Sequence, residues 1–98
     1  MTSLDILFKP IKIGNLNLPN RIWLAPLTRC RAGVEHLPND LMAKYYAQRA
    51  SAGLSITEAT MVMEGNSSFW QEPGVYSKEQ IIGWRKTTDA VHQAGGRG

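Results

Sequence analysis

The fold of this chain is constrained most strongly by the order of two similar segments, residues 24–29 and residues 56–60. Each segment reads as the end of a buried strand that runs into a polar loop, and a helical pattern follows each one. The resulting order of strand, loop, helix, strand, loop and helix is typical of a parallel sheet whose functional groups lie where the strands end. The sequence therefore predicts an α/β fold with a candidate site at one edge of the sheet.

A hairpin and a first strand are predicted before the first helix. Residues 6–18 alternate weakly around Gly14-Asn15, a pair that favours a turn with positive φ, so we expect a short hairpin there. Residues 21–25 are dense in large apolar side chains, as expected of a strand that is buried on both faces of a parallel sheet. Pro26 ends this strand because proline has no backbone N–H to donate.

The first helix is predicted from its cap and its spacing. Asn39 is a favourable N-cap for a helix over residues 40–51, and Gly53 is the expected stop. One side of this helix carries four residues at helical spacing, namely Leu41, Tyr45, Gln48 and Ala52.

The second unit begins with a strand over residues 54–59, and a loop over residues 60–76 follows that is too long to be a simple connection. Ser77 and Gln80 have the spacing of a capping box and predict the start of a second helix, which closes near Gly95. One face of this helix carries Ile81, Trp84, Thr88 and Val91.

Together these elements predict one domain segment with a hairpin at 6–18, a first β/α unit at 21–52 and a second unit at 54–95. The crossover helix between parallel strands requires a right-handed βαβ connection. Two such units cannot close a barrel, since a (β/α)8 barrel typically needs about 250 residues. We therefore expect an incomplete piece of a TIM barrel, which is marginally stable alone because strand edges and an inner face are uncovered.

Composition excludes several classes of protein. Of 98 residues, 43% are apolar and 19% are charged, and the net charge of +3 is too scattered to indicate a nucleic-acid interface. No apolar run approaches the roughly 20 residues of a membrane-spanning helix. His36 and His92 lack metal-ligand spacing. A single cysteine, Cys30, and an N-terminus unlike a signal peptide predict a soluble, cytoplasmic protein with no metal site and no membrane contact.

Nearly the whole chain carries motifs that occur together in one known family. In chain order they are Pro19-Asn20-Arg21-Ile22, Ala25-Pro26-Leu27-Thr28-Arg29, Tyr45-Tyr46 with Gln48-Arg49-Ala50, Ala52-Gly53-Leu54, Ile56-Thr57-Glu58-Ala59-Thr60, Pro73-Gly74-Val75-Tyr76, Gln80-Ile81, Trp84 and His92-Gln93-Ala94-Gly95-Gly96-Arg97. Their number and order resemble the N-terminal portion of the old yellow enzymes. The resemblance is closest to the branch of N-ethylmaleimide reductase and pentaerythritol tetranitrate reductase.

The resemblance implies a TIM-barrel oxidoreductase with FMN as its cofactor. Such enzymes take hydride from NADPH or NADH and reduce activated C=C bonds, as in enones and maleimides, or nitro compounds. It also implies that the catalytic groups lie on later strands, so no catalytic residue is expected in this segment. The remainder of the barrel would be supplied in cis or as a second chain.

The resemblance implies four residues at the cofactor. Pro26, Leu27 and Thr28 match family positions that lie against the flavin, and Ala59 matches a position whose backbone lies near the same ring. The Thr28 hydroxyl would tune the flavin potential, because a fixed donor to a flavin carbonyl stabilises the electron-rich reduced ring. Taken alone, each of these residues has an ordinary structural explanation, such as ending a strand or bonding to loop backbone.

Phe69 and Trp70 are the candidate substrate-binding residues, since family members place an aromatic residue beside the substrate in this loop. Residues 67–72 depart from the family's usual small, glycine-rich loop, so which of the two rings faces the pocket stays open. Glu58 is interpreted as a structural hydrogen-bond acceptor, because it has no identified partner for acid/base chemistry.

Three hypotheses follow. The chain is a segment of an FMN-dependent ene-reductase, a catalytically silent remnant or interaction module with the same N-terminal sequence, or an unrelated small α/β domain. The number of colinear motifs favours the first hypothesis.

Overall fold

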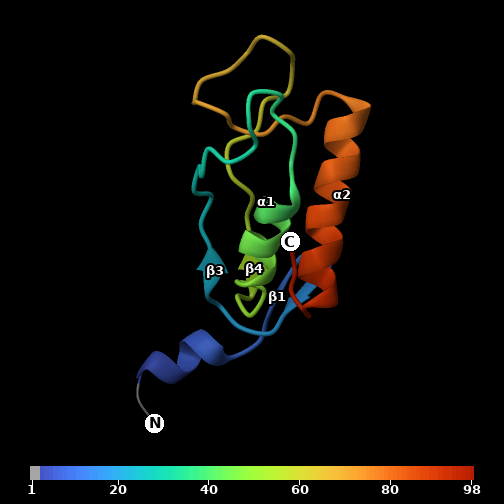
Figure 1. Ribbon diagram of the computed structural model, residues 1–98. Helices are drawn as coiled ribbons and strands as arrows, with labels where there is room; N and C mark the ends of the chain where they lie inside the picture. Colours follow the sequence, from blue (N-terminus) through green and yellow to red (C-terminus); the bar gives the residue numbers. More distant parts are fainter. Residues whose placement is uncertain (1–2) are drawn as a thin grey trace.

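The computed structural model describes residues 3–98, which form an elongated molecule of 50 × 25 × 24 Å (Figure 1). A 3-10 helix and a hairpin lie at the N-terminal end, and a two-stranded parallel sheet with two α-helices forms the rest. In chain order the elements are η1 (Ser3–Phe8), β1 (Ile11–Ile13), β2 (Leu16–Leu18), β3 (Trp23–Leu24), α1 (Asp40–Ala47), β4 (Leu54–Ser55) and α2 (Lys78–Gln93).

The expected hairpin is present, although it is shorter than residues 6–18. β1 and β2 pair antiparallel, and Gly14 takes a φ of +58°, which glycine adopts without steric cost. Residues 6–8 belong instead to η1. This helix ends there because Pro10 disfavours the helical conformation at Lys9.

β3 and β4 pair in parallel, and α1 is the crossover between them. The pairing extends beyond the strands, since Gly53 N donates to the Ile22 carbonyl at 2.7 Å. On the other edge of β4, Ser55 N donates to the Arg97 carbonyl at 2.8 Å. The far edge of β4 is thus partly covered by the last residues of the chain, whereas the far edge of β3 pairs with no other strand among residues 3–98.

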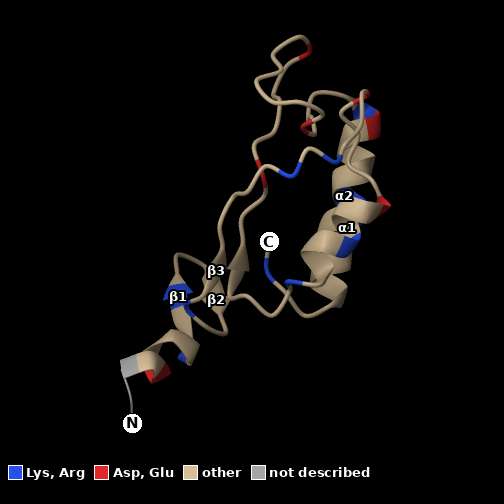
Figure 2. Cartoon of the chain, turned by 60° about the vertical axis from the view of Figure 1, so that its left-hand side comes forward, with Lys and Arg blue, Asp and Glu red and all other residues tan. Residues whose placement is uncertain are grey.

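Two expectations about the strands were wrong. The strands are shorter than residues 21–25 and 54–59, and β3 is not buried on both faces, because Trp23 is 42% exposed. Figure 2 shows the reason for this exposure, since both helices lie on one side of the small sheet and leave its other face open. β3 stops just before Pro26, which offers no N–H to a neighbouring strand.

α1 has the expected N-cap but ends before residue 51. The Asn39 side chain accepts a hydrogen bond from Met42 N at 3.0 Å. After Ala47, turns with i to i+3 hydrogen bonds replace the helix, as in the bond from Ala50 N to the Ala47 carbonyl. Ser51 and Gly53, which have low helix propensity, follow at once.

The buried face of α1 is shifted by one residue from the stripe noted in the sequence. Met42 and Tyr46 are buried, whereas Leu41 is 57% exposed and Tyr45 is half-buried. Both sides of α1 carry large apolar residues, so spacing alone does not determine which side is buried more deeply.

α2 begins with the expected capping box and ends at the expected glycine. Ser77 Oγ accepts a bond from Gln80 N, and Gln80 Oε1 accepts one from Ser77 N. At the other end Gly95 has a φ of +87°, and Gly96 N donates to the Val91 carbonyl at 2.9 Å, which completes a Schellman motif.

The hydrophobic core lies between α1, α2 and the loop that follows β3. On α2, Trp84 and Val91 are buried as expected, whereas Ile81 is 55% exposed and Thr87 is buried in place of Thr88. The core residues are Ala32, Met42, Tyr46, Ala50, Trp84 and Val91.

Candidate functional site

The two strand-end segments leave the sheet at the same end, because β3 and β4 are parallel. We call this side of the molecule, where the carboxyl ends of both strands lie, the strand-end edge. Arg29, in the segment after β3, donates its backbone N–H to Oε1 of Glu58, which follows β4, at 3.4 Å. This bond joins the two segments one residue away from Thr28 and one residue away from Ala59. The structure therefore brings both segments to one edge, as the sequence predicted.

Glu58 is held in place by Tyr46 of α1. The Tyr46 hydroxyl donates to Glu58 Oε2 at 2.7 Å, and Glu58 N donates back to the same hydroxyl oxygen at 3.0 Å. Both side chains are 2% exposed. Burial raises the pKa of the Tyr46 phenol well above its usual value, and the bond to Glu58 raises it further. The interpretation of Glu58 as a structural acceptor is confirmed.

A second set of bonds ties the loop after β3 to the loop after β4. Ala32 N donates to the Gln71 carbonyl at 3.1 Å, and Gly74 N donates to the His36 carbonyl at 2.8 Å. The His36 ring lies 2.6 Å from the Glu72 carbonyl oxygen through Nδ1. Because a carbonyl only accepts, Nδ1 carries the hydrogen. The two loops therefore form one connected unit.

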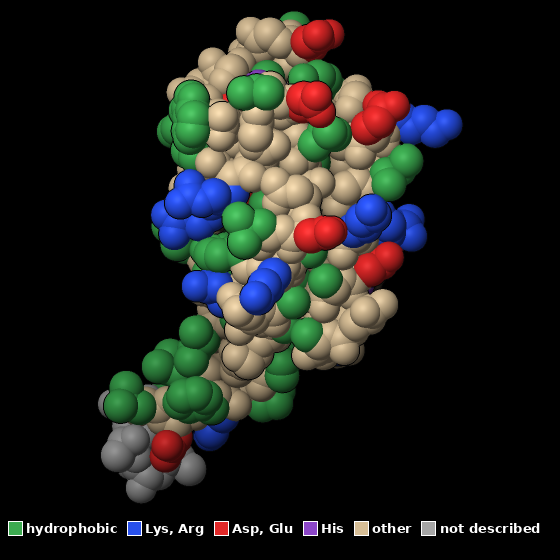
Figure 3. All heavy atoms as spheres, viewed as in Figure 1, with side chains coloured by type: hydrophobic (Ala, Val, Ile, Leu, Met, Phe, Trp, Pro, Cys, Tyr) green, Lys and Arg blue, Asp and Glu red, His purple; other side chains and the backbone are tan. Residues whose placement is uncertain are grey.

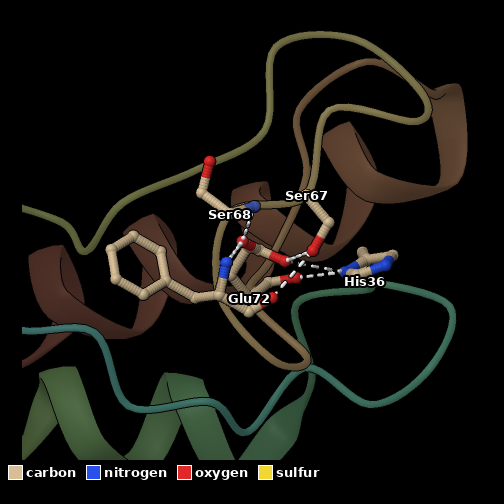
Figure 4. Close-up of polar contacts among 5 residues, drawn as sticks. His36, Ser67, Ser68 and Glu72 are labelled. Carbon is tan, nitrogen blue, oxygen red and sulfur yellow. Dashed lines mark hydrogen bonds and ion pairs between the residues drawn. The ribbon is translucent and has the colours of Figure 1, made fainter.

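The Glu72 side chain anchors the tip of the second loop (Figure 4). Ser67 Oγ donates to Oε1 at 2.5 Å, while Ser68 N and Phe69 N donate to Oε2 at 3.0 and 2.5 Å. Oε1 also lies 3.6 Å from Nδ1 of His36. Burial alone would raise the pKa of the Glu72 carboxyl, but the bonds from Ser67, Phe69 and Ser68 outweigh burial and hold that pKa below its usual 4.5.

The sequence does not reveal this role of Glu72. Two of its three donors are backbone N–H groups, which every residue except proline carries, so residue identity does not reveal them. The only signal in the sequence is an acidic residue that follows two serines in a long loop, a pattern too common to single out.

Backbone strain is concentrated in these two loops. Among residues 3–98 the non-glycine residues with positive φ are Cys30 and His36 in the first loop, both at 56°, and Gln71 in the second, at 52°. This conformation costs roughly 1 kcal/mol or more per residue. The bonds across the loops hold the backbone in it, so the loops are fixed in shape rather than free to relax.

The four candidate cofactor residues remain open to solvent at the strand-end edge. Leu27 is 47% exposed, Pro26 and Ala59 are exposed, and Thr28 is half-buried. The Thr28 hydroxyl makes no hydrogen bond within the part of the chain that the structure describes. An unpaired hydroxyl between exposed apolar groups fits a flat, largely apolar ring that carries a hydrogen-bond acceptor. The residues present are therefore compatible with a flavin.

The structure separates the two candidate substrate residues. Phe69 lines a cavity of about 130 Å³ together with Ala59 and Glu72, whereas Trp70 lies outside it and is 69% exposed. Phe69 is thus the aromatic residue that shares a pocket with one of the candidate cofactor residues. The backbone N–H of Phe69 is also one of the two that donate to Glu72.

Neither a membrane-spanning helix nor a cluster of metal ligands is present within residues 3–98. No helix there is long and apolar enough to cross a membrane. No three His, Cys, Asp or Glu side chains of that part of the chain come together as metal ligands.

Comparison with known proteins identifies relatives along nearly the whole chain. The family described as the NADH:flavin oxidoreductase / NADH oxidase family matches residues 6–97. A probable flavin mononucleotide-dependent alkene reductase of Leishmania infantum is 52% identical over 94 residues, which are 96% of this chain and 26% of that protein.

Solved structures agree with this result. The old yellow enzyme from Trypanosoma cruzi is 52% identical with a TM-score of 0.92, over 97% of this chain and 26% of that one. Morphinone reductase in complex with tetrahydroNAD is 45% identical with a TM-score of 0.89, over 93% of this chain and 25% of that one. The chain therefore spans about a quarter of the length of these relatives and matches the N-terminal quarter of their TIM-barrel structures.

Removal of the Tyr46 hydroxyl should lower the stability of the chain, because the bonds of Glu58 at the strand-end edge depend on it. Tyr46→Phe leaves a buried Glu58 oxygen without its donor and Glu58 N without its acceptor. We expect a loss of about 1 to 3 kcal/mol in the free energy of unfolding, measured by urea denaturation with circular dichroism. Tyr45→Phe is the matched control, since that hydroxyl has no hydrogen bond within residues 3–98. Equal midpoints for the two variants would contradict the role of Tyr46.

The Glu72 anchor should weaken in acid. Its lowered pKa means that the stabilisation is complete above the usual value of 4.5 and is lost as the pH falls through the lower folded value. We expect the amides of Ser68 and Phe69 to exchange hydrogen about tenfold faster in Glu72→Gln at neutral pH, without the acid dependence of the unmodified chain. Glu64→Gln, an exposed change in the same loop, should behave as the unmodified chain. If both glutamine variants left these rates unchanged, Glu72 would not anchor the loop.

Proposed function

The chain belongs to the NADH:flavin oxidoreductase / NADH oxidase family, and on that premise we propose that it forms the first part of the flavin site of an FMN-dependent ene-reductase. The complete enzyme takes hydride from NADPH or NADH and reduces activated C=C bonds, as in enones or maleimides, or nitro compounds. In this proposal the chain contributes the hairpin and the first two β/α units of a (β/α)8 barrel. The remaining units come in cis or as a second chain.

The observation that carries the proposal is the single edge formed by the two strand ends. Functional groups of barrel enzymes lie at this end of the strands. The bond from Arg29 N to Glu58 sets Thr28 and Ala59 on adjoining segments of that edge, and both keep a surface free for a ligand.

The proposed roles follow from the chemistry of each side chain. Bound FMN supplies the ability to accept a hydride from the coenzyme and pass it to the substrate. Pro26 and Leu27 provide an apolar surface for the ring, and Ala59 is small enough to let its backbone approach closely. The Thr28 hydroxyl donates a hydrogen bond to a ring acceptor and so favours the more electron-rich state.

Phe69, with Trp70 on the outside, forms one wall of the substrate pocket in this proposal. Glu72 fixes the backbone at Phe69 and therefore the position of that wall. This segment offers no catalytic residue, so the groups that polarise and protonate the substrate belong to the rest of the barrel. Phe69→Ala is accordingly expected to change the choice of substrate more than the affinity for flavin.

The proposed function can be tested by co-expressing this chain with the part of the barrel that it does not contain. We define the complement as the part of the Trypanosoma cruzi old yellow enzyme that this chain does not match, and co-express it with this chain. The proposal expects a purified complex with the visible absorbance of bound flavin and with NADPH-dependent reduction of N-ethylmaleimide. A folded but colourless complex would favour the silent interaction module instead.

Thr28→Ala in the same complex tests the hydroxyl directly. The lost hydrogen bond to a charged ring is worth roughly 1.5 to 3 kcal/mol, so the midpoint potential of the flavin should fall by roughly 30 to 65 mV for a two-electron couple. Potentiometry at equal flavin occupancy measures the shift, and Thr60→Ala, whose hydroxyl bonds to the Glu58 carbonyl, is the control. An unchanged midpoint potential in Thr28→Ala would mean that the Thr28 hydroxyl does not bond to the flavin and that Thr28 is an ordinary loop residue.

A further inference from the structure

The tip of the loop after β4, which we define as residues 62–70, has no hydrophobic core of its own. Every residue of this loop tip is exposed. Val62 is 71% exposed, Met63 60% and Phe69 49%, and Figure 3 shows hydrophobic side chains open to solvent at this upper end of the molecule. Because burial of apolar side chains does not fix the loop tip, its shape depends on hydrogen bonds.

The base of the same loop is firmly attached to the rest of the chain. Met61 N donates to the Pro73 carbonyl at 3.0 Å, and Val75 N donates to the Met61 carbonyl at 2.9 Å, so the two ends of the loop are joined. Trp84 of α2 donates its ring N–H to the Gly74 carbonyl at 3.0 Å. The loop tip therefore needs only a link to this fixed base to keep one position.

Glu72 provides that link. Its carboxylate, which is 2% exposed, accepts the backbone N–H groups of Ser68 and Phe69 from the loop tip. Its backbone directly precedes Pro73, which belongs to the base. The position of Phe69 is therefore set by the place where the backbone of Glu72 is held.

His36, in the loop after β3, holds the backbone of Glu72. Figure 4 shows the His36 ring pointing toward Glu72, with Nδ1 2.6 Å from the carbonyl oxygen and 3.6 Å from Oε1. The His36 carbonyl accepts Gly74 N at 2.8 Å, so this one residue makes bonds on both sides of Pro73. His36 has a φ of 56°, a conformation in which His, Asn and Asp are enriched.

We propose that His36 is a positioning residue for the substrate pocket, which fixes Phe69 through Glu72 and thereby limits the size of the substrate. This inference rests on the proposed function, which makes Phe69 a wall of that pocket. His36 itself does not line the cavity that Phe69 lines. Loss of its ring frees the backbone of Glu72 and with it the loop tip, so the wall recedes and larger substrates fit.

The variants separate the ring of His36 from the backbone conformation of its loop. His36→Gly removes the ring and adopts the positive φ without steric cost. His36→Asn is the conservative variant, because asparagine also tolerates positive φ and its amide nitrogen, like Nδ1, is attached to Cγ and carries hydrogen. Cys30→Gly is the matched control, since Cys30 has the same φ of 56° in the same loop and its thiol makes no hydrogen bond within residues 3–98. If His36→Gly does not fold, His36→Asp replaces it, because an aspartate tolerates the same φ but only accepts hydrogen bonds.

Amide hydrogen exchange of the 98-residue chain, followed by NMR, tests the placement of the loop tip without flavin. We expect the amides of Ser68 and Phe69 to exchange at least about fivefold faster in His36→Gly than in the unmodified chain, because the loop tip loses its link to the base. His36→Asn should restore most of the protection, and Cys30→Gly should change the rates by less than about twofold. Equal rates in His36→Gly and the unmodified chain overturn the proposal.

Steady-state kinetics of the complex with the complement defined above test the substrate preference, or of a single-chain fusion if the complement does not fold alone. N-phenylmaleimide and N-ethylmaleimide differ only in the group on nitrogen, so the ratio of their kcat/KM values reports the size of the pocket. We expect the ratio of the phenyl to the ethyl compound to rise at least about threefold in His36→Gly, to return in His36→Asn and to stay unchanged in Cys30→Gly. A merely structural role would lower both kcat/KM values together and leave their ratio unchanged, and that result overturns the proposal.

A double-mutant cycle with Phe69→Ala tests whether His36 acts through Phe69. Once the Phe69 ring is absent, His36→Gly should change the ratio no further. Effects of the two substitutions that multiply independently overturn the proposal.

The two kinds of measurement separate this inference from its premise. A complex without bound FMN contradicts the proposed function, and the exchange rates of the chain alone then decide whether His36 positions Phe69. A flavin-binding complex whose kcat/KM ratio does not respond to His36→Gly supports the proposed function and overturns the inference.

Discussion

The hydrogen bonds around Glu58 hold together the three parts of the molecule that make its strand-end edge. A carboxylate that is 2% exposed is costly unless its oxygens are bonded. Tyr46 from α1 and Arg29 N from the loop after β3 supply those bonds, and Tyr46 also accepts from Glu58 N. Burial of this one side chain therefore requires the helix and both segments to keep fixed positions. The open surfaces of Thr28 and Ala59 follow from that arrangement.

Features with local causes could be predicted from the sequence. Asn39 caps α1, Ser77 and Gln80 form a capping box, and Gly95 ends α2 with a positive φ, because each of these needs only residues within a turn of one another. The parallel order of the two strands was predicted for a similar reason, since a helix between two strands leaves few alternatives. The motif order that resembled the old yellow enzymes is confirmed by the relatives.

Features that depend on distant neighbours could not be predicted. The length and burial of β3 depend on which layers cover it, and here only one face is covered, so Trp23 is exposed. The choice between the two apolar stripes of α1 is made by α2, and the anchor at Glu72 is made by backbone groups. The chain spans about a quarter of the length of its relatives, and among residues 3–98 no further strand pairs with the outer edge of β3.

The two strand ends are joined into one edge by the hydrogen bonds around Glu58. Hydrogen exchange of individual amides in the 98-residue chain, followed by NMR, tests it most directly. We expect the amides of Arg29 and Glu58 to be protected to the same degree as those of α1 and to lose protection together with them, because Glu58 bonds to both Arg29 N and Tyr46. Exchange of the Arg29 and Glu58 amides at the rate of an unstructured peptide, while α1 and α2 stay protected, would contradict it.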